Sequence, residues 1–360
     1  MNKNLISLAV AAALAAPLAV NAAPTVYGAA HLSVDSLDNG NAANNKLTTL
    51  SSNSSYIGFK GDEDLGNGLK AIYGFEWQIG LDNASSGLTS TTSNRNAFAG
   101  FSGGFGTFRA GNYDDVVKQV GRKVDFFWNE QLGESRAITR GTDAAPSAAT
   151  AYWDERLANS LNYESAKIGG STTVTVNYGM ANNTDTSTAS QLTATAIGVQ
   201  YEAGALYVGL GYKTVDVNGG TVVNTTKATR LTAAYTMGNF KVAGFYQAVK
   251  DEAGATGADR TVTGLGASFV MGQGTVKAQM YKAGDNKTAN TGATLTAIGY
   301  DYKMSNTTSV YVAYASVDND SAAAYSVVGA GHANPSETGY AATGDGKDPS
   351  GLSVGMKVSF

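Results

Sequence analysis

Residues 351–360 read GLSVGMKVSF, and this stretch alternates strictly between apolar and polar or small residues. The apolar residues share one parity: Leu352, Val354, Met356, Val358 and Phe360. A period of two residues predicts a β-strand with one apolar and one polar face. Chain termini are usually loose and polar. We nevertheless expect this last segment to be an ordered strand.

The same alternation recurs along the chain, as in LKAIYGFEWQI at 69–79 and ALYVGLGYK at 205–213. The segments are about ten residues long, whereas a typical strand has five or six. We predict sixteen strands, at approximately 25–36, 54–62, 68–80, 94–102, 106–113, 155–165, 171–181, 192–202, 205–216, 228–236, 240–250, 260–271, 274–284, 294–304, 308–317 and 351–360.

The connections between these segments alternate between short and long. Short turns lie at 62–68, 102–106, 202–205, 237–240, 271–274 and 303–308. Longer polar stretches lie at 37–53, 81–93, 182–191, 217–227, 251–259, 285–293 and 318–350. Alternating connections in a row of antiparallel strands place all short turns on one side, which is typical of a transmembrane β-barrel.

Proline positions agree with this assignment, because proline lacks the N–H group that a strand ladder needs. The prolines after residue 22 are Pro24, Pro146, Pro335 and Pro349, and none interrupts an alternating segment. A large soluble β-sandwich or β-solenoid is the competing architecture, since its strands also alternate.

The two faces of the strands favour the barrel over the sandwich. The apolar face carries aromatic residues such as Trp77, Tyr178 and Tyr300, as an interfacial girdle requires. The opposite face carries isolated charges, which are costly in a packed sandwich but suit a water-filled lumen. By strand parity its basic residues are Lys60, Lys70, Arg95, Arg109, Arg156, Lys213, Arg230, Lys241, Lys277, Lys303 and Lys357, and its acidic residues are Asp35, Glu76, Glu164, Glu202 and Asp301.

Composition and the N-terminal segment narrow the class further. Charged residues make up 15 %, cysteine is absent and the net charge is −4 without a basic run, so we expect no nucleic-acid partner. Residues 1–22, MNKNLISLAVAAALAAPLAVNA, predict a secretory signal peptide followed by a mature barrel at 23–360. A membrane-anchoring helix is the alternative, although the apolar segment is short and rich in alanine.

Three blocks resemble the general diffusion porins of Gram-negative bacteria, in particular the trimeric family of β-proteobacteria and Neisseria. They are YIGFKGDEDLGNGLKAIYGFEW at 56–77, NRNAFAGFSGGFGTFRAGNYDD at 94–115 and RLANSLNYES at 156–165. The resemblance implies an all-β, sixteen-stranded antiparallel barrel in the outer membrane. Its short turns would be periplasmic, its long loops extracellular, and its third loop folded into the lumen.

The resemblance also implies partners. It implies a homotrimer surrounded by outer-membrane lipid and lipopolysaccharide, and it makes Phe360 the signal read by the outer-membrane assembly machinery. Arg95 and Arg156 match family positions of a basic ladder on the pore wall. Tyr56 and Asn112 stand where relatives often have arginine, and an arginine common two residues before Tyr163 is not seen. We therefore expect a thinner ladder than is usual.

Residues 114–154 follow the fifth predicted strand and are the candidate constriction loop. A structureless loop of this length is unusual in a compact domain, but a porin lumen provides a place for it. Its acidic residues are Asp114, Asp115, Asp125, Glu130 and Glu134. An ordinary surface loop is the alternative, although the aromatic run at 126–128 requires burial.

We expect no enzyme activity, cofactor or metal. The chain has two histidines, His31 and His332, and no familiar metal-ligand spacing. The predicted function is passive diffusion of small hydrophilic solutes and ions, with a modest anion preference from Lys60, Lys70, Arg95 and the other wall cations. A substrate-specific channel and a surface adhesin that uses the long loop 318–350 remain the alternatives.

Overall fold

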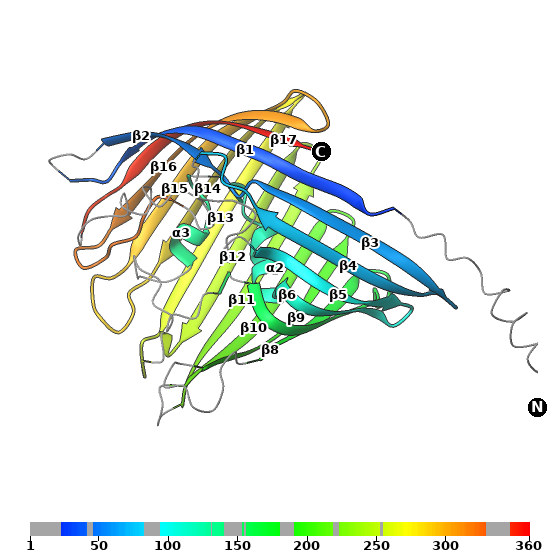
Figure 1. Cartoon of the computed structure of the whole chain (residues 1–360). Coiled ribbons are helices and arrows are strands. Elements are labelled where there is room, and N and C mark those ends of the chain that lie inside the picture. The colour runs from blue at the N-terminus through cyan, green and yellow to red at the C-terminus, as the bar shows by residue number, and fades with distance from the viewer. Residues whose placement is uncertain are drawn as a thin grey trace, which may run out of the picture.

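The computed structural model describes residues 23–41, 46–82, 94–130, 132–139, 153–154, 156–180, 191–218, 223–252, 255–328 and 346–360. The predicted signal peptide at 1–22 lies outside the described residues. Figure 1 shows a tilted wall of strands that encloses two short helices, α2 (Val116–Arg122) and α3 (Arg136–Thr139). Within the described part of the chain, no helix combines the length and the apolar character needed to cross a membrane.

Antiparallel pairing links all the strands, and the sheet closes because the first strand pairs with the last. The strands are β1 (Thr25–Asp38), β2 (Lys46–Ser52), β3 (Tyr56–Gly66), β4 (Leu69–Gln78), β5 (Asn94–Gly103), β6 (Gly106–Asp114), β7 (Arg156–Ser165), β8 (Thr172–Gly179), β9 (Gln191–Ala203), β10 (Leu206–Asn218), β11 (Val223–Met237), β12 (Phe240–Lys250), β13 (Arg260–Met271), β14 (Gly274–Ala283), β15 (Ala293–Lys303), β16 (Thr308–Asn319) and β17 (Ser350–Ser359).

Strands β2 and β3 together form one position in the barrel. β2 pairs with the second half of β1 and β3 with its first half, so seventeen strands occupy sixteen positions. The predicted sixteen-stranded barrel is therefore confirmed. The prediction that 37–53 is entirely a loop was wrong, because Lys46–Ser52 is paired with Leu32–Asp38.

Side chains bridge the break between β2 and β3. Ser54 has a positive φ of 56°, which interrupts the extended backbone. There the Ser55 hydroxyl accepts a hydrogen bond from the His31 N–H at 2.9 Å and donates one to the His31 carbonyl at 3.0 Å. The hydroxyl thus supplies the acceptor that the His31 N–H would find in a regular ladder, while the His31 carbonyl also accepts from the Asn53 N–H at 2.8 Å. Sequence periodicity missed β2 because KLTTLSS is mainly polar.

The two faces of the sheet differ as predicted. On β17, Leu352 and Val354 are 47 % and 56 % exposed, whereas Ser353 between them is fully buried. Large apolar side chains thus point outward and small or polar ones inward, as in a barrel with a lipid-facing exterior. Tyrosines recur on the outer face, at Tyr163, Tyr178, Tyr201, Tyr212, Tyr235, Tyr246, Tyr300, Tyr302 and Tyr314.

The barrel closes at the last residue. Phe360 donates its N–H to the Gly28 carbonyl at 3.1 Å, and Gly28 donates to the Phe360 carbonyl at 3.0 Å. A Cβ on Gly28 would lie 2.5 Å from the Tyr56 carbonyl oxygen and 2.6 Å from the Phe360 ring. Only glycine leaves room for this close approach.

The third loop folds into the barrel. Helix α2 packs against β8–β11 and α3 against β14 and β15. The barrel wall has glycines where the helix contacts it. A Cβ on Gly198 would meet Val116, and one on Gly211 would meet Val117. Val116, Val117 and Phe127 are fully buried, which gives the apolar part of 114–154 the burial its sequence demanded.

The last long loop contributes to the same interior. Ala323, Tyr325 and Val327 are buried in one cluster with Leu132 and Ile138 of the third loop. An isolated β-bridge joins Leu132 to Val328. The beginning of the stretch 318–350 therefore packs against the inward-folded loop.

Candidate functional site

The lumen has two walls that treat their basic residues differently. We define the covered wall as β9–β15, against which the third loop packs, and the accessible wall as β4–β7. Lys213, Arg230 and Lys277 stand on the covered wall, and Arg95, Arg109 and Arg156 on the accessible wall. Inner-face parity had placed all six in the lumen without distinguishing the two groups.

On the covered wall, Lys213, Arg230 and Lys277 each bind a carboxylate of the loop. Lys213 pairs with Asp115 at 2.6 Å, and Arg230 binds both Asp154 oxygens at 2.5 and 2.9 Å. Lys277 pairs with Glu130 and, at 3.0 Å, with Asp301. Lys213, Arg230 and Lys277 are at most 4 % exposed. These three cations therefore anchor the loop to the wall.

Neutral and basic wall residues that sequence reasoning missed complete the anchorage. Gln279 donates to Asp125 at 2.8 Å and to the Gly133 carbonyl at 2.7 Å. Gln247 donates to the Thr139 carbonyl at 3.0 Å, and Arg260 donates to the Ile138 carbonyl at 2.9 Å. The available signal was a long polar side chain at an inner-face position, where Ala, Gly or Thr is the common choice.

The five acidic residues predicted for the constriction are all buried. Asp115 caps α2 by accepting from the Lys118 N–H at 2.9 Å. Asp125 accepts from the N–H and the hydroxyl of Ser135 at 2.8 and 2.7 Å. Glu134 pairs with Arg136 at 2.5 Å. These carboxylates hold the loop in shape instead of facing a solute.

Burial and pairing shift the pKa values of the loop carboxylates. Burial raises the pKa of Glu134 from its ordinary 4.5 to about 7, against the opposing charge of Arg136. Burial likewise raises the pKa of Glu130 to about 7, opposed by Lys277. Burial also acts on Asp154, but the charge and hydrogen bonds of Arg230 outweigh it and hold the pKa of Asp154 below its ordinary value.

Asp114 connects the loop to the accessible wall. Its carboxylate pairs with Lys118 at 3.0 Å, Arg122 at 2.9 Å and Arg156 at 3.3 Å. Three cations around one carboxylate leave an excess of positive charge at this point of the lumen. Arg122 is 42 % exposed, so part of this charge reaches solvent.

On the accessible wall the ion pairs are longer and the arginines lie over aromatic rings. Arg95 lies 3.5 Å from Glu76 and 4.9 Å from the centre of the Tyr56 ring. Arg109 lies 3.7 Å from Glu164 and 4.7 Å from the Tyr113 ring centre. Among the described residues, the Nε of Arg95 and the Nε of Arg109 have no hydrogen-bond acceptor. These two Nε atoms are shielded from solvent, whereas the two side chains as a whole are 13 % and 14 % exposed.

Tyr56 and Asn112, at which the resemblance led us to expect arginine, take part in this arrangement. Tyr56 supports Arg95 through its ring, and Asn112 donates to the Arg95 carbonyl at 2.7 Å. Asn162 is buried and donates to Ser160 at 2.9 Å. Tyr56 also packs edge-on against Tyr27, with 6.1 Å between the two ring centres. Two lumen tyrosines that are distant in sequence are therefore neighbours.

Three further predicted wall lysines lie towards the short-turn end. Lys60 lies 4.9 Å from the Tyr27 ring centre. Lys70 pairs with Asp62 at 2.7 Å on an exposed surface. Lys241 donates to the Lys123 carbonyl at 3.3 Å. These three do not reach the anchored part of the loop formed by α3.

The candidate catalytic and metal residues are placed as follows. His31 is buried, and its Nε2 lies 3.0 Å from the Tyr311 hydroxyl. His332 lies outside the described residues. Among the described residues, no group of three or more His, Asp or Glu side chains is arranged to hold a metal ion.

Curated relatives and solved structures agree with this geometry. The chain is 34 % identical to the major outer membrane protein P.IB of Neisseria lactamica over 176 residues, which is 47 % of this chain and 48 % of the relative. It is 37 % identical to P.IB of Neisseria gonorrhoeae over 131 residues, 35 % of this chain and 36 % of the relative. The matches thus span about half or less of these relatives.

Structural similarity covers more of the chain. An anion-selective porin from Comamonas acidovorans superimposes with a TM-score of 0.79 at 25 % identity, over 94 % of this chain and 99 % of that one. The outer membrane protein OmpT of Vibrio cholerae shares the fold, with a TM-score of 0.65 at 17 % identity over 95 % and 100 % of the two chains. A family model described as Gram-negative porin matches residues 8–322. The chain therefore belongs to the Gram-negative porin family, whose barrels lie in the outer membrane.

Proposed function

We propose that this protein forms a water-filled channel for passive diffusion of small hydrophilic solutes and ions, with a modest preference for anions. The observation that carries the proposal is the accessible wall. There Arg95, Arg109 and Arg156 are 13–18 % exposed and lie 3.3–3.7 Å from their carboxylate partners. Charged groups lining a pore weigh ions by sign.

Local charge favours anions although the whole chain is acidic. The carboxylates of the loop are buried against Lys213, Arg230, Lys277 and Arg136. Charges farther away than a Debye length of about 8 Å are largely screened at physiological salt. A solute in the lumen therefore experiences mainly the arginines beside it. The similarity to an anion-selective porin supports this assignment.

The preference is modest because the accessible wall also holds carboxylates. Glu76 and Glu164 each lie within 4 Å of an arginine and cancel part of its field. Tyr56 and Asn112 stand where an additional arginine would add positive charge. We therefore propose weaker selectivity than a full basic ladder would give.

Residues 114–154 act as the constriction in this proposal. Support comes from α2 and from residues 125–130 and 132–139, which occupy the interior and are anchored to it by ion pairs. The acidic residues of the loop act by fixing its position. The arginines on the opposite wall supply the charge that a permeating ion meets.

The reversal potential in a salt gradient tests the proposal. Purified protein in a planar bilayer should form channels and show an anion preference that decreases as salt rises. Arg95→Glu should shift the selectivity towards cations. A clear cation preference of the unmodified protein would refute the wall-charge argument, and a lack of conductance would refute the channel itself.

We propose a transport role without catalysis. His31 contacts the Tyr311 hydroxyl, while Asp35 accepts a hydrogen bond from Ser33 at 2.9 Å and another from Ser51. Nucleophilic catalysis would need a nucleophile bonded to a base that is itself oriented by a third group. The described contacts of His31 do not give it that arrangement.

Assembly partners follow from family membership and from the closing strand. We propose a homotrimer in contact with lipid and lipopolysaccharide, delivered by the outer-membrane assembly machinery that reads Phe360. Phe360 is 62 % exposed on the outer face while its backbone completes the seam with Gly28. Its side chain is therefore accessible to a partner before lipid covers it.

Removal of Phe360 tests the assembly proposal. Deleting it should lower the amount of heat-modifiable trimer in the outer membrane, because the seam loses two hydrogen bonds and the signal. Phe360→Tyr is the matched control, since it keeps both the backbone and an aromatic ring. Wild-type trimer levels from the deletion variant would contradict the proposed signal.

A further inference from the structure

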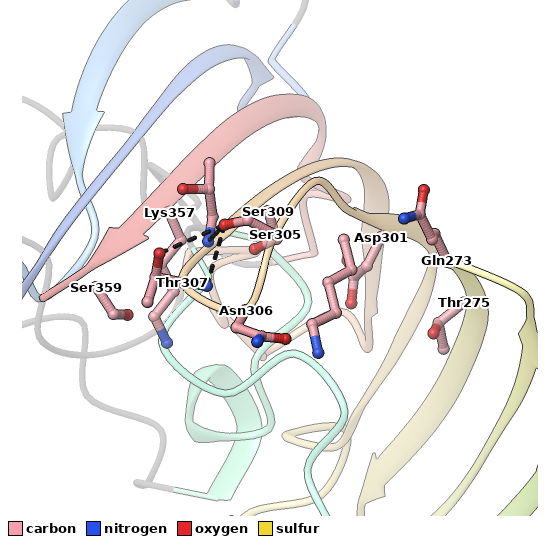
Figure 2. Close-up of a pocket in the computed structure, with 11 residues that line it drawn as sticks. Gln273, Thr275, Asp301, Ser305, Asn306, Thr307, Ser309, Lys357 and Ser359 are labelled. Carbon is pink, nitrogen blue, oxygen red and sulfur yellow. Dashed lines mark hydrogen bonds between the residues drawn. The ribbon is translucent and has the colours of Figure 1, made fainter.

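A shallow pocket of about 310 Å³ lies on the inner wall at the short-turn end of the barrel, where β15, β16 and β17 meet. Figure 2 shows Ser309, Lys357 and the turn residues Ser305, Asn306 and Thr307 gathered around it, with Asp301 towards one side. Lys303 also lines the pocket. The pocket is separate from the arginines of the accessible wall, which stand on β5–β7.

The strand register explains how two lysines share this pocket. Lys303 pairs with Ser309 across β15 and β16, and Ser309 pairs with Lys357 across β16 and β17. The three residues therefore form one row across adjacent strands, with their side chains on the same face. Neighbouring strands are about 4.8 Å apart, so the backbones of Lys303 and Lys357 lie about 10 Å from each other, one on either side of Ser309. Lysine side chains easily span half that distance.

The pocket offers donors that the protein does not use. Among the described residues, Lys303 and Lys357 have no ion-pair partner, in contrast to Lys277 one strand further along. The side chains of Ser309 and Asn306 likewise have no hydrogen-bond partner within the described part of the chain. Two ammonium groups, a hydroxyl and an amide form a donor set suited to an oxyanion.

One acceptor narrows the class of anion. Asp301 lines the same pocket and its side chain is 35 % exposed; its Oδ2 lies 3.0 Å from Lys277 and keeps a second lone pair, whereas its Oδ1 is buried. A ligand oxygen without a proton would be repelled by this carboxylate, whereas a ligand hydroxyl could donate to it. Hydrogen phosphate has both kinds of group at neutral pH. Sulfate has acceptors only.

We propose that this pocket is an oxyanion-binding site that prefers hydrogen phosphate to sulfate, with Lys303, Lys357 and Ser309 holding the anionic oxygens and Asp301 accepting from the P–OH group. The inference rests on the proposed channel function. It adds an anion-binding site at the periplasmic mouth to the arginines of the accessible wall. An anion that has passed the accessible wall would meet these lysines next. No covalent chemistry is involved.

Binding of inorganic phosphate to the full mature protein in detergent tests the site, by isothermal titration calorimetry with sulfate as the competitor. The unmodified protein should bind phosphate saturably and more tightly than sulfate. Lys303→Gln combined with Lys357→Gln should weaken phosphate binding about fivefold, because each partly exposed charge contact is worth up to about 1 kcal/mol. Asp301→Asn should remove the preference for phosphate over sulfate.

A matched control removes two lysines at the other end of the barrel. Lys282→Gln with Lys287→Gln takes away the same charge near the end of β14, far from the pocket, and should leave phosphate binding unchanged. Equal weakening by both double variants would overturn the site, as would equal affinity of the unmodified protein for phosphate and sulfate. Heat-modifiable migration on a gel checks that each variant is folded.

Chloride conductance of the same samples separates the two proposals. Normal chloride conductance together with no phosphate binding would refute only the mouth site. Saturable, lysine-dependent phosphate binding without any conductance would refute the channel function and leave the pocket as a binding site. Loss of block by phosphate in the Lys303 and Lys357 double variant, with chloride conductance retained, is the result expected if both hold.

Discussion

The covered wall and the accessible wall carry the same residue types at the same inner-face parity but use them differently. Lys213 and Arg230 are almost fully buried and pair with loop carboxylates at 2.5–2.6 Å. Arg95 and Arg109 are partly exposed and lie 3.5–3.7 Å from wall carboxylates, over aromatic rings. The difference shows that a pore-wall cation can serve as an anchor or as a field source, according to what lies in front of it.

Removing the inward loop should produce the largest change, because it abolishes the difference between the walls. Replacing 115–154 by a short Gly-Ser linker uncovers Lys213, Arg230 and Lys277 and removes their loop partners Asp115, Asp154 and Glu130. We expect higher single-channel conductance and a stronger anion preference in a planar bilayer. The closed strand pairing does not use this segment, so the variant should remain heat-modifiable. Unchanged conductance would place the loop away from the permeation path.

Breaking one anchor should separate stability from selectivity. Arg230→Leu leaves Asp154 buried without its bidentate partner, and such a change costs about 3–5 kcal/mol. Arg109→Leu on the accessible wall should cost about 1 kcal/mol or less, because its pair is long and partly solvated. Denaturant unfolding of the two variants compares these costs. Equal destabilisation would contradict the division into anchors and field sources.

Changes of charge on the two walls should give the opposite ranking for ion selectivity. Arg109→Glu should move the reversal potential in a salt gradient towards cations, since the side chain borders the accessible lumen. Lys213→Gln should leave the reversal potential close to that of the unmodified protein while destabilising the loop. A selectivity shift as large for Lys213→Gln as for Arg109→Glu would mean that the covered wall also acts on permeating ions.

Acidity should change the docking of the loop through Glu134. Burial raises the pKa of Glu134 from an ordinary 4.5 to about 7. Between these two pH values the Glu134 carboxyl is therefore protonated in the docked loop and ionised in the undocked loop. The resulting stabilisation is complete below about pH 4.5 and is lost as the pH rises through about 7. Proteolysis of 125–139 should therefore increase from pH 5 to pH 8. Glu134→Gln should remove part of this dependence, and the remainder is expected from Glu130, whose pKa burial raises to about 7 as well.

Much of the fold was predictable from local pattern. A strand has a period of two, so parity alone divided Leu352 and Val354 from Ser353, and the sides found for them agree. The strand β2 was missed because its alternation is between Thr, Ser and Leu, which carries little contrast in polarity. β2 is held by its pairing with Leu32–Asp38 of β1, and the residue pattern within β2 does not reveal this pairing.

The candidate site was predictable only in part. Parity identified Arg95, Arg109 and Lys277 as inner-face residues, and their side chains lie there. The sequence did not indicate that Gln247 and Gln279 bind the loop, because a polar inner-face residue can equally face water. Nor did it indicate that Asp125 and Glu134 turn towards Ser135 and Arg136 within the loop.

The sequence by itself determined the class of the molecule: alternating strands, alternating connections and a closing aromatic residue require a barrel with a polar interior. These features are local, because each follows from side-chain spacing along one strand. Only the tertiary structure decided which wall the third loop covers, and hence which cations are neutralised. That choice depends on contacts between residues far apart in the chain, such as Arg230 with Asp154 and Lys277 with Glu130, whose charges cancel only when folding brings them together.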